Sequence, residues 1–196
     1  YFLDHAGDQI HEVAGGGADT VRVTIDYTLL AGLDIERLIA NDAASTAGVD
    51  LTGNELGQSI TGDQGANVID GKGGADTLTG LGGDDIYYVD QAKDVIREEI
   101  GGGLDEARAS ASYALRAGVE VETLTTVDAA ATTTINLTGN EFAQTIVGNA
   151  GANRLYGAEG NDVLTGGAGA DHFYFTTALG PANVDTITDF SHVDDT

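Results

Sequence analysis

Large apolar residues recur along this chain about every nine positions, each flanked by polar or small residues. Thr77-Leu78-Thr79 and Val163-Leu164-Thr165 are two such segments, and Ile69 and Leu155 hold the same position in others. Side chains alternate between the two faces of a strand, so the central residue is expected to point inward. The same spacing continues through the series Leu78, Tyr87, Ile96, Ala107, Leu115 and Leu124. The pattern predicts an all-β chain of very short strands.

Helix signals are poor, because no apolar pattern with a period of about 3.6 residues is sustained. The segment from Leu104 to Val121, rich in Ala and Arg, comes closest to a helical composition. Its counterpart from Ala18 to Leu33 is rich in Thr, Val and Ile. We therefore predict strand for both.

A glycine–aspartate nonapeptide, G-G-x-G-x-D-x-U-x with U large and apolar, surrounds these apolar positions. It occurs in tandem at 71–79 and 80–88, and again at 157–165 and 166–174. Its first six residues predict a turn that needs the backbone freedom of glycine. The other three predict a strand. Stacked copies would place the aspartates, which end the turns, in a column.

A longer repeat of 86 residues carries the nonapeptides. Between 51–85 and 137–171, 19 of 35 positions are identical. We therefore expect two units, 1–86 and 87–172, and the start of a third at 173–196. Each full unit has a spacer (1–52, 87–138) followed by nonapeptides (53–86, 139–172). The chain begins and ends within a repeat unit and has no Met. We therefore expect it to be a piece of a longer repeat protein.

These motifs resemble the RTX (hemolysin-type) calcium-binding repeat family, in its long-spacer variety. The resemblance implies a right-handed parallel β-roll, or β-solenoid, that binds several Ca²⁺ ions in its glycine-rich turns. It also implies a bacterial protein exported by type I secretion to the medium or the cell surface. We interpret the spacer as further rungs of the solenoid. A separate sandwich-like insertion is the alternative.

The resemblance also implies which residues hold calcium, an ion that takes about six to eight oxygen ligands. One turn supplies the carbonyls of positions two and four and its aspartate. The turn eighteen residues later supplies the carbonyls of positions one and three and its own aspartate. Gln58, Asn67, Gln144 and Asn153 replace the aspartate in the outer copies, where weaker binding is expected. The residues implied are Asp63, Gly65, Asn67, Lys72, Gly74, Asp76, Gly80, Leu81, Gly82, Gly83, Asp85, Val89, Gln91, Asp94, Asp105, Asn149, Gly151, Asn153, Ala158, Gly160, Asp162, Gly166, Gly167, Ala168, Gly169, Asp171 and Asp185.

Composition narrows the possible partners. The chain has 32 acidic and 8 basic residues, for a net charge of -24. Nucleic acid is therefore not expected as a partner, because no basic patch is present to contact phosphates. The chain has no cysteine, so no disulfide can stabilise it. No apolar run is long enough to span a membrane.

Catalysis is not expected. The four histidines lie in no metal-protease spacing, and the acidic pairs Asp84/Asp85 and Asp194/Asp195 lie in repeat turns. We interpret the chain as a calcium-binding segment of a secreted structural or adhesin-type protein, with neighbouring repeat units or a cell-surface polysaccharide as further partners. One alternative is the C-terminal roll of a secreted enzyme such as a protease, lipase or epimerase. Another is a carbohydrate-binding module that uses the recurring tyrosines Tyr27, Tyr113, Tyr88 and Tyr174 on one face.

Overall fold

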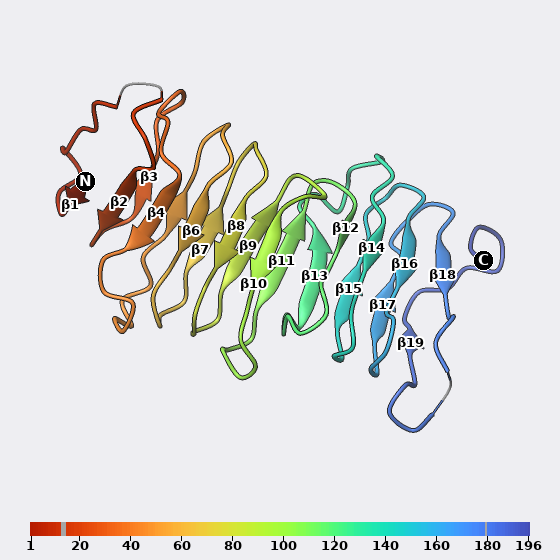
Figure 1. Cartoon of the computed structure of the whole chain (residues 1–196). Helices are drawn as coiled ribbons and strands as arrows, with labels where there is room; N and C mark the ends of the chain where they lie inside the picture. Colours follow the sequence, from red (N-terminus) through yellow and green to blue (C-terminus); the bar gives the residue numbers. More distant parts are fainter. Residues whose placement is uncertain (13–14, 179) are drawn as a thin grey trace.

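The computed structural model describes residues 1–12, 15–178 and 180–196. Over these residues the chain forms short strands and no helix, stacked into an elongated solenoid of about 10 turns (Figure 1). The all-β prediction is confirmed, including strand rather than helix within 104–121. The strands are β1 (Phe2–Leu3), β2 (Thr20–Val23), β3 (Tyr27–Thr28), β4 (Arg37–Ala40), β5 (Leu51–Thr52), β6 (Ser59–Thr61), β7 (Val68–Asp70), β8 (Thr77–Thr79), β9 (Ile86–Val89), β10 (Val95–Arg97), β11 (Glu106–Ala109), β12 (Tyr113–Ala114), β13 (Thr123–Thr126), β14 (Leu137–Thr138), β15 (Thr145–Val147), β16 (Arg154–Tyr156), β17 (Val163–Thr165), β18 (His172–Tyr174) and β19 (Thr186–Ile187).

From β2 onward, successive strands alternate between the two faces of the roll, and all paired strands are parallel. One face carries a six-stranded sheet, β1-β2-β4-β6-β8-β10, and then a four-stranded sheet, β12-β14-β16-β18. The other carries one nine-stranded sheet that runs from β3 to β19. The spacer strands β11 and β13 pair directly with each other, and they continue the ladder from β9 to β15. The spacer is therefore part of the solenoid, as predicted, and not a separate sandwich.

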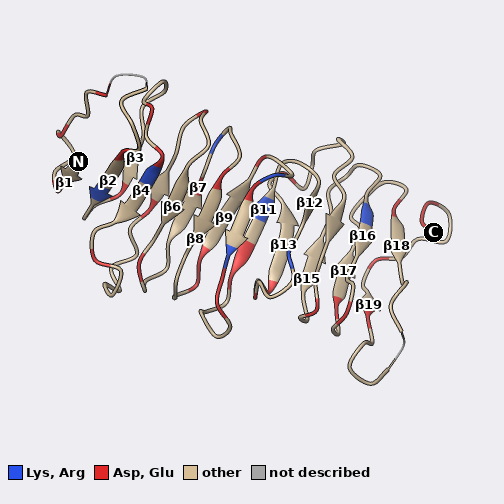
Figure 2. Ribbon diagram, in the orientation of Figure 1, with Lys and Arg blue, Asp and Glu red and all other residues tan. Residues whose placement is uncertain are grey.

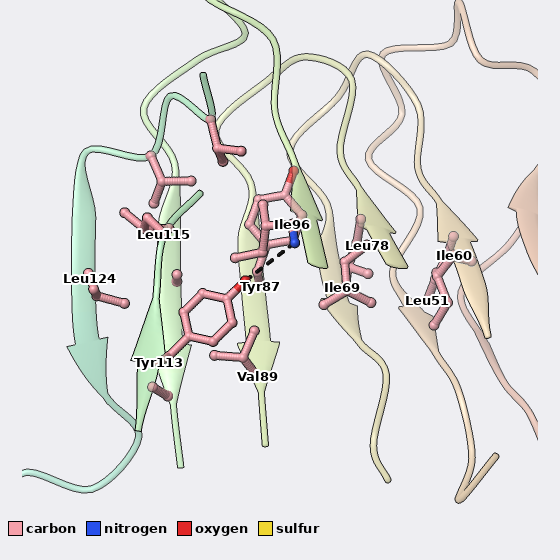
Figure 3. Close-up of a cluster of buried hydrophobic side chains, with 14 of the residues drawn as sticks. Leu51, Ile60, Ile69, Leu78, Tyr87, Val89, Ile96, Tyr113, Leu115 and Leu124 are labelled. Carbon is pink, nitrogen blue, oxygen red and sulfur yellow. Dashed lines mark hydrogen bonds between the residues drawn. The ribbon is translucent and has the colours of Figure 1, made fainter. Parts of the chain in front are cut away.

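The core is a narrow column of inward-pointing side chains, one or two from each strand (Figure 3). Leu78 pairs in register with Ile60 on one side and Ile96 on the other. Leu78, Leu155 and Leu164 have no exposed surface, as the alternation predicted. Burying one such side chain stabilises a fold by about 1.5–3 kcal/mol. Because each rung contributes so few, every inward residue is a large share of its rung's stability.

Residues 86 positions apart lie on opposite faces of the roll. β7 belongs to the nine-stranded sheet, whereas β16, its counterpart in the next repeat, belongs to the four-stranded sheet. One repeat contains nine strands, β2 to β10, and this odd number places β11, the counterpart of β2, on the opposite face. Tyr88 in β9 and Tyr174 in β18 consequently lie in different sheets. The division at 86/87 stays a prediction, since the nine-stranded sheet passes through both units.

Candidate metal centres

Four nonapeptide turns end in a buried aspartate that leads directly into a strand; we call them the acid turns. They are 71–76, 80–85, 157–162 and 166–171, and their aspartates Asp76, Asp85, Asp162 and Asp171 are at most 1% exposed. Positions two and four are left-handed in each: φ is 59° at Lys72 and 108° at Gly74. The other pairs are Leu81 and Gly83, Ala158 and Gly160, and Gly167 and Gly169. The nonapeptide therefore gives the same tight loop each time.

Glycine at position four is required by its conformation and by the neighbouring rung. A Cβ atom at Gly74 would lie 2.5 Å from the carbonyl carbon of Leu56. The positive φ would also strain any L-residue placed there. The rungs can stack this closely only because the side chain is missing.

The two oxygens of each acid-turn carboxylate have different environments. Asp85 Oδ1 accepts the backbone N–H of Asn67, eighteen residues earlier, at 2.7 Å. Asp171 Oδ1 does the same with Asn153 at 2.8 Å. The Oδ2 atoms of Asp76, Asp85, Asp162 and Asp171 are buried and have no hydrogen-bond partner. One oxygen thus fixes the stack that the eighteen-residue spacing predicted, and the other is left bare.

The bare oxygen points over the first glycine of its own turn. A Cβ atom at Gly80 would lie 1.8 Å from Asp85 Oδ2. In the preceding rung, a Cβ atom at Gly62 would lie 2.0 Å from Asn67 Oδ1 and 3.1 Å from the carbonyl oxygen of Gly80. Oxygens of two successive turns therefore converge on one small volume, which position-one glycine keeps free.

Burial makes the negative charge of these groups costly. Burial, together with a smaller effect of neighbouring carboxylates, raises the pKa of Asp76 and Asp85 to about 7 against the lowering effect of the Oδ1 hydrogen bond. It raises the pKa of Asp162 to about 6. Acidic residues lie along the turns of the roll (Figure 2). In the described part of the chain the ion pairs are Lys72–Asp70 and Arg108–Glu106, and neither includes an acid-turn aspartate.

Comparison with known families agrees with this geometry. A model of the RTX calcium-binding nonapeptide repeat matches in four copies, over residues 61–96 and 138–173. The chain carries RTX calcium-binding repeats. Such repeats bind Ca²⁺ ions, and several are present. Among curated proteins and solved structures, none matches the chain.

The RTX turns fit calcium in their donor set. Calcium prefers carboxylate and carbonyl oxygens as ligands. Its charge would neutralise the buried carboxylate oxygens that have no hydrogen-bond partner. When bound, the ion would supply positive charge between stacked turns. The carbonyls of Gly80, Leu81, Gly82 and Gly83 accept no hydrogen bond from described residues, so they remain available as ligands.

The outer RTX copies form a second kind of turn, which we call the amide turns: 53–58, 62–67, 139–144 and 148–153. Here position six is Gln or Asn, and positions two and four, all described, have no positive φ. Asn67 Oδ1 accepts the N–H of Asp63 at 2.9 Å. Asn67 Nδ2 donates to the carbonyl of Val49 at 2.9 Å. Asn153 is bonded in the same way to Asn149 and Ile135. The side-chain amide thus forms hydrogen bonds with backbone groups through both its oxygen and its nitrogen.

Some of the predicted ligands have other partners in the structure. Val89 O accepts the N–H of Ser110, and Gln91 O accepts that of Asp94. Asp94 Oδ2 accepts the N–H groups of Asp90 and Gln91. Ala158 O accepts the Thr177 hydroxyl at 2.7 Å. The turn at 89–94 therefore has fewer free oxygens than the acid turns.

The other predicted spacer aspartates lie in the columns. Asp105 Oδ1 accepts the N–H of Asp85 at 2.8 Å, and Asp185 Oδ1 that of Asp162 at 3.0 Å. Asp63 keeps a bare buried Oδ2 of its own. The remaining predicted residues, Gly65, Gly151, Gly166 and Ala168, lie in the turns described above, next to these side chains.

Sequence reasoning missed Glu98. Its side chain is buried and accepts a hydrogen bond from the Tyr87 hydroxyl. Carboxylate oxygens of Glu98, Asp85 and Asp105 all lie within 4.8 Å of one another. The available signal was the recurrence of Tyr87 and Glu98 as Tyr1 and Glu12, 86 residues earlier.

Proposed function

We propose that this chain is a calcium-dependent structural solenoid, part of a secreted bacterial protein of the structural or adhesin type. The observation that carries the proposal is the set of buried carboxylate oxygens without a partner in the acid turns. An uncompensated buried charge strongly opposes folding, and bound calcium removes the penalty. Metal binding then becomes folding free energy.

The calcium sites are proposed to lie at the acid turns and not at the amide turns. An acid turn has a bare carboxylate oxygen, left-handed positions two and four, and free carbonyls. An amide turn already bonds both ends of its Asn or Gln side chain. The amide turns other than 62–67, which carries the bare Oδ2 of Asp63, therefore act as metal-free rungs, on which the acid turns stack.

A surface role fits the rest of the molecule. The RTX roll is a calcium-binding structural element and not a catalytic one. In the described part of the chain no helix is long and apolar enough to cross a membrane. A solenoid that is unfolded where calcium is scarce can be secreted as an unfolded chain. It then folds into a stiff spacer where calcium is abundant.

Calcium titration of the metal-stripped chain tests the proposal. Circular dichroism should show coil without calcium and a cooperative gain of strand signal as calcium is added. The control is magnesium, which demands a smaller, stricter octahedral site and should restore much less strand. A metal-stripped chain that keeps its full strand signal and melting temperature would overturn the proposal.

A further inference from the structure

The turn from 98 to 105 differs from every nonapeptide turn at its first residue. Glu98 follows β10 directly, where Gly80 follows β8 in the acid turn before it in the same column. Glycine at this place leaves room for a carboxylate, whereas Glu98 brings another carboxylate into that room. Its side chain is turned inward and is only 5% exposed.

Three carboxylates meet at this point. Asp85, Glu98 and Asp105 are all buried, and one oxygen of each lies within 4.8 Å of the others. Asp85 Oδ2 has no partner and points over Gly80, toward the Tyr87 hydroxyl. No described Lys or Arg forms an ion pair with any of the three.

The hydrogen bonds hold the cluster in place and leave oxygens for a ligand. Tyr87 donates its hydroxyl to Glu98 Oε2, and the Glu99 N–H donates to Glu98 Oε1 at 3.0 Å. The Asp85 N–H donates to Asp105 Oδ1 at 2.8 Å. Tyr87 is itself a core residue with no exposed surface, so it fixes Glu98 from the interior.

The arrangement recurs in the first unit. The Tyr1 hydroxyl donates to the Glu12 carboxylate, as Tyr87 does to Glu98. The N–H of Asp19, the counterpart of Asp105, donates to Glu36, as Asp105 donates to Glu122. Asp19 Oδ2 is also buried without a partner. The hydrogen bonds that hold Glu98 and Asp105 therefore occur in both units of the repeat.

We propose that Asp85, Glu98 and Asp105 form a calcium site of a second type, with a glutamate carboxylate in place of the position-one carbonyl used by the nonapeptides. This site joins the nonapeptide block 53–86 to the spacer that follows it. Three carboxylates suit a hard cation of high charge, so a trivalent lanthanide should bind there as well. The inference rests on the calcium-binding function proposed above.

Calorimetric titration of the full chain with calcium tests the site. Glu98→Gln keeps the shape of the side chain and removes its charge, so the number of bound ions should fall by one. The matched control is Glu99→Gln, an exposed neighbour that should bind as the parent does. An unchanged ion number and affinity in Glu98→Gln would overturn the site and show that Glu98 only hydrogen-bonds Tyr87. A parent chain that binds no calcium would instead defeat the general function.

A second measurement does not depend on the folding of that variant. The chain has no Trp, so Tb³⁺ emission can be excited only through nearby tyrosines. Tyr87→Phe keeps all three carboxylates and should lose much of the sensitised emission. Tyr88→Phe alters the next side chain, whose hydroxyl bonds Arg108 outside the cluster, and should keep it. Equal emission from the two variants would contradict a metal beside Tyr87.

Discussion

Asp85 accepts the backbone N–H of Asn67 through Oδ1 and leaves Oδ2 buried without a partner. The hydrogen bond positions the aspartate on the rung before it, so the bare oxygen is held in place before any ligand arrives. Folding without a cation therefore brings an uncompensated charge into the interior. The same geometry that organises the site makes the metal-free fold costly.

This relationship predicts different outcomes for two neighbouring aspartates. Asp85→Asn should lower calcium affinity and the melting temperature in calcium, because a charged ligand is lost. Asp84→Asn is the matched control, since Asp84 is exposed and its Oδ1 only accepts the Leu104 N–H. Calorimetry and thermal denaturation in saturating calcium would check both. Equal losses in the two variants would contradict the site assignment.

The pH dependence of the metal-free chain follows from the raised pKa values. Burial raises the pKa of Asp76 and Asp85 from 3.8 to about 7, so the folded state binds protons more tightly than the unfolded state. Their contribution to stability is complete below pH 3.8 and is lost as the pH rises through about 7. The metal-free chain should therefore show more strand signal at pH 4 than at pH 8. A strand signal that rises from pH 5 to pH 8 without metal would contradict this.

Leu164 tests the core. Leu164→Ala should cost about 2–5 kcal/mol, because the side chain is fully buried and its rung has few others. The variant should also need more calcium to fold, since calcium and packing stabilise the same state. Val163→Ala, a 37% exposed neighbour in β17, should change little. Calcium titration followed by circular dichroism measures both, and an unchanged midpoint for Leu164→Ala would disprove the strand register.

Gly74 tests the tight contact between rungs. Gly74→Ala combines a positive φ of 108° with a Cβ 2.5 Å from Leu56. At Gly118 φ is also positive, at 80°, but an added Cβ would have no atom within 4 Å. Gly118→Ala therefore measures the backbone strain alone. Strain of this kind costs about 1–3 kcal/mol, and Gly74→Ala should cost more. Chemical denaturation in calcium compares them, and equal losses would rule out the contact as a constraint.

The repeat predicted most of this fold because each rung is specified locally. One apolar residue between polar neighbours set the inward positions, and Leu78 and Leu164 are both fully buried. The eighteen-residue spacing was enough to predict that Asp85 stacks on Asn67, and the two are hydrogen-bonded. Such features depend on residues within one or two rungs, which the sequence displays directly.

Other features depend on what a side chain bonds to, which spacing does not show. Asn67 was expected to lend an oxygen to a metal, but its amide also donates to Val49 and so completes its own turn. Glu98 was overlooked because it has no nonapeptide around it, and its hydrogen bond with Tyr87 reveals it. The reversal of faces between units required counting strands in the spacer, where two-residue strands such as β12 leave little trace in the sequence.

Asn153→Asp should convert an amide turn into a calcium-dependent one. Asn153 Nδ2 donates to Ile135 O at 2.8 Å and to Asn149 Oδ1 at 3.1 Å. An aspartate cannot donate these bonds, so the metal-free chain should lose about 1–3 kcal/mol from unsatisfied buried groups. Calcium should recover that loss, because the new carboxylate stacks beside Asp171 in the same column.

The measurement is the calcium concentration at which half of the strand signal is gained, followed by circular dichroism, which should be higher for Asn153→Asp than for the parent. Asn161→Asp is the matched control, because it adds the same charge at an exposed position. Its Oδ1 accepts the Val184 N–H at 2.8 Å, a bond that aspartate keeps. If both variants shift this calcium midpoint equally, added charge alone explains the effect, and the bonded amide does not set the calcium dependence of its turn.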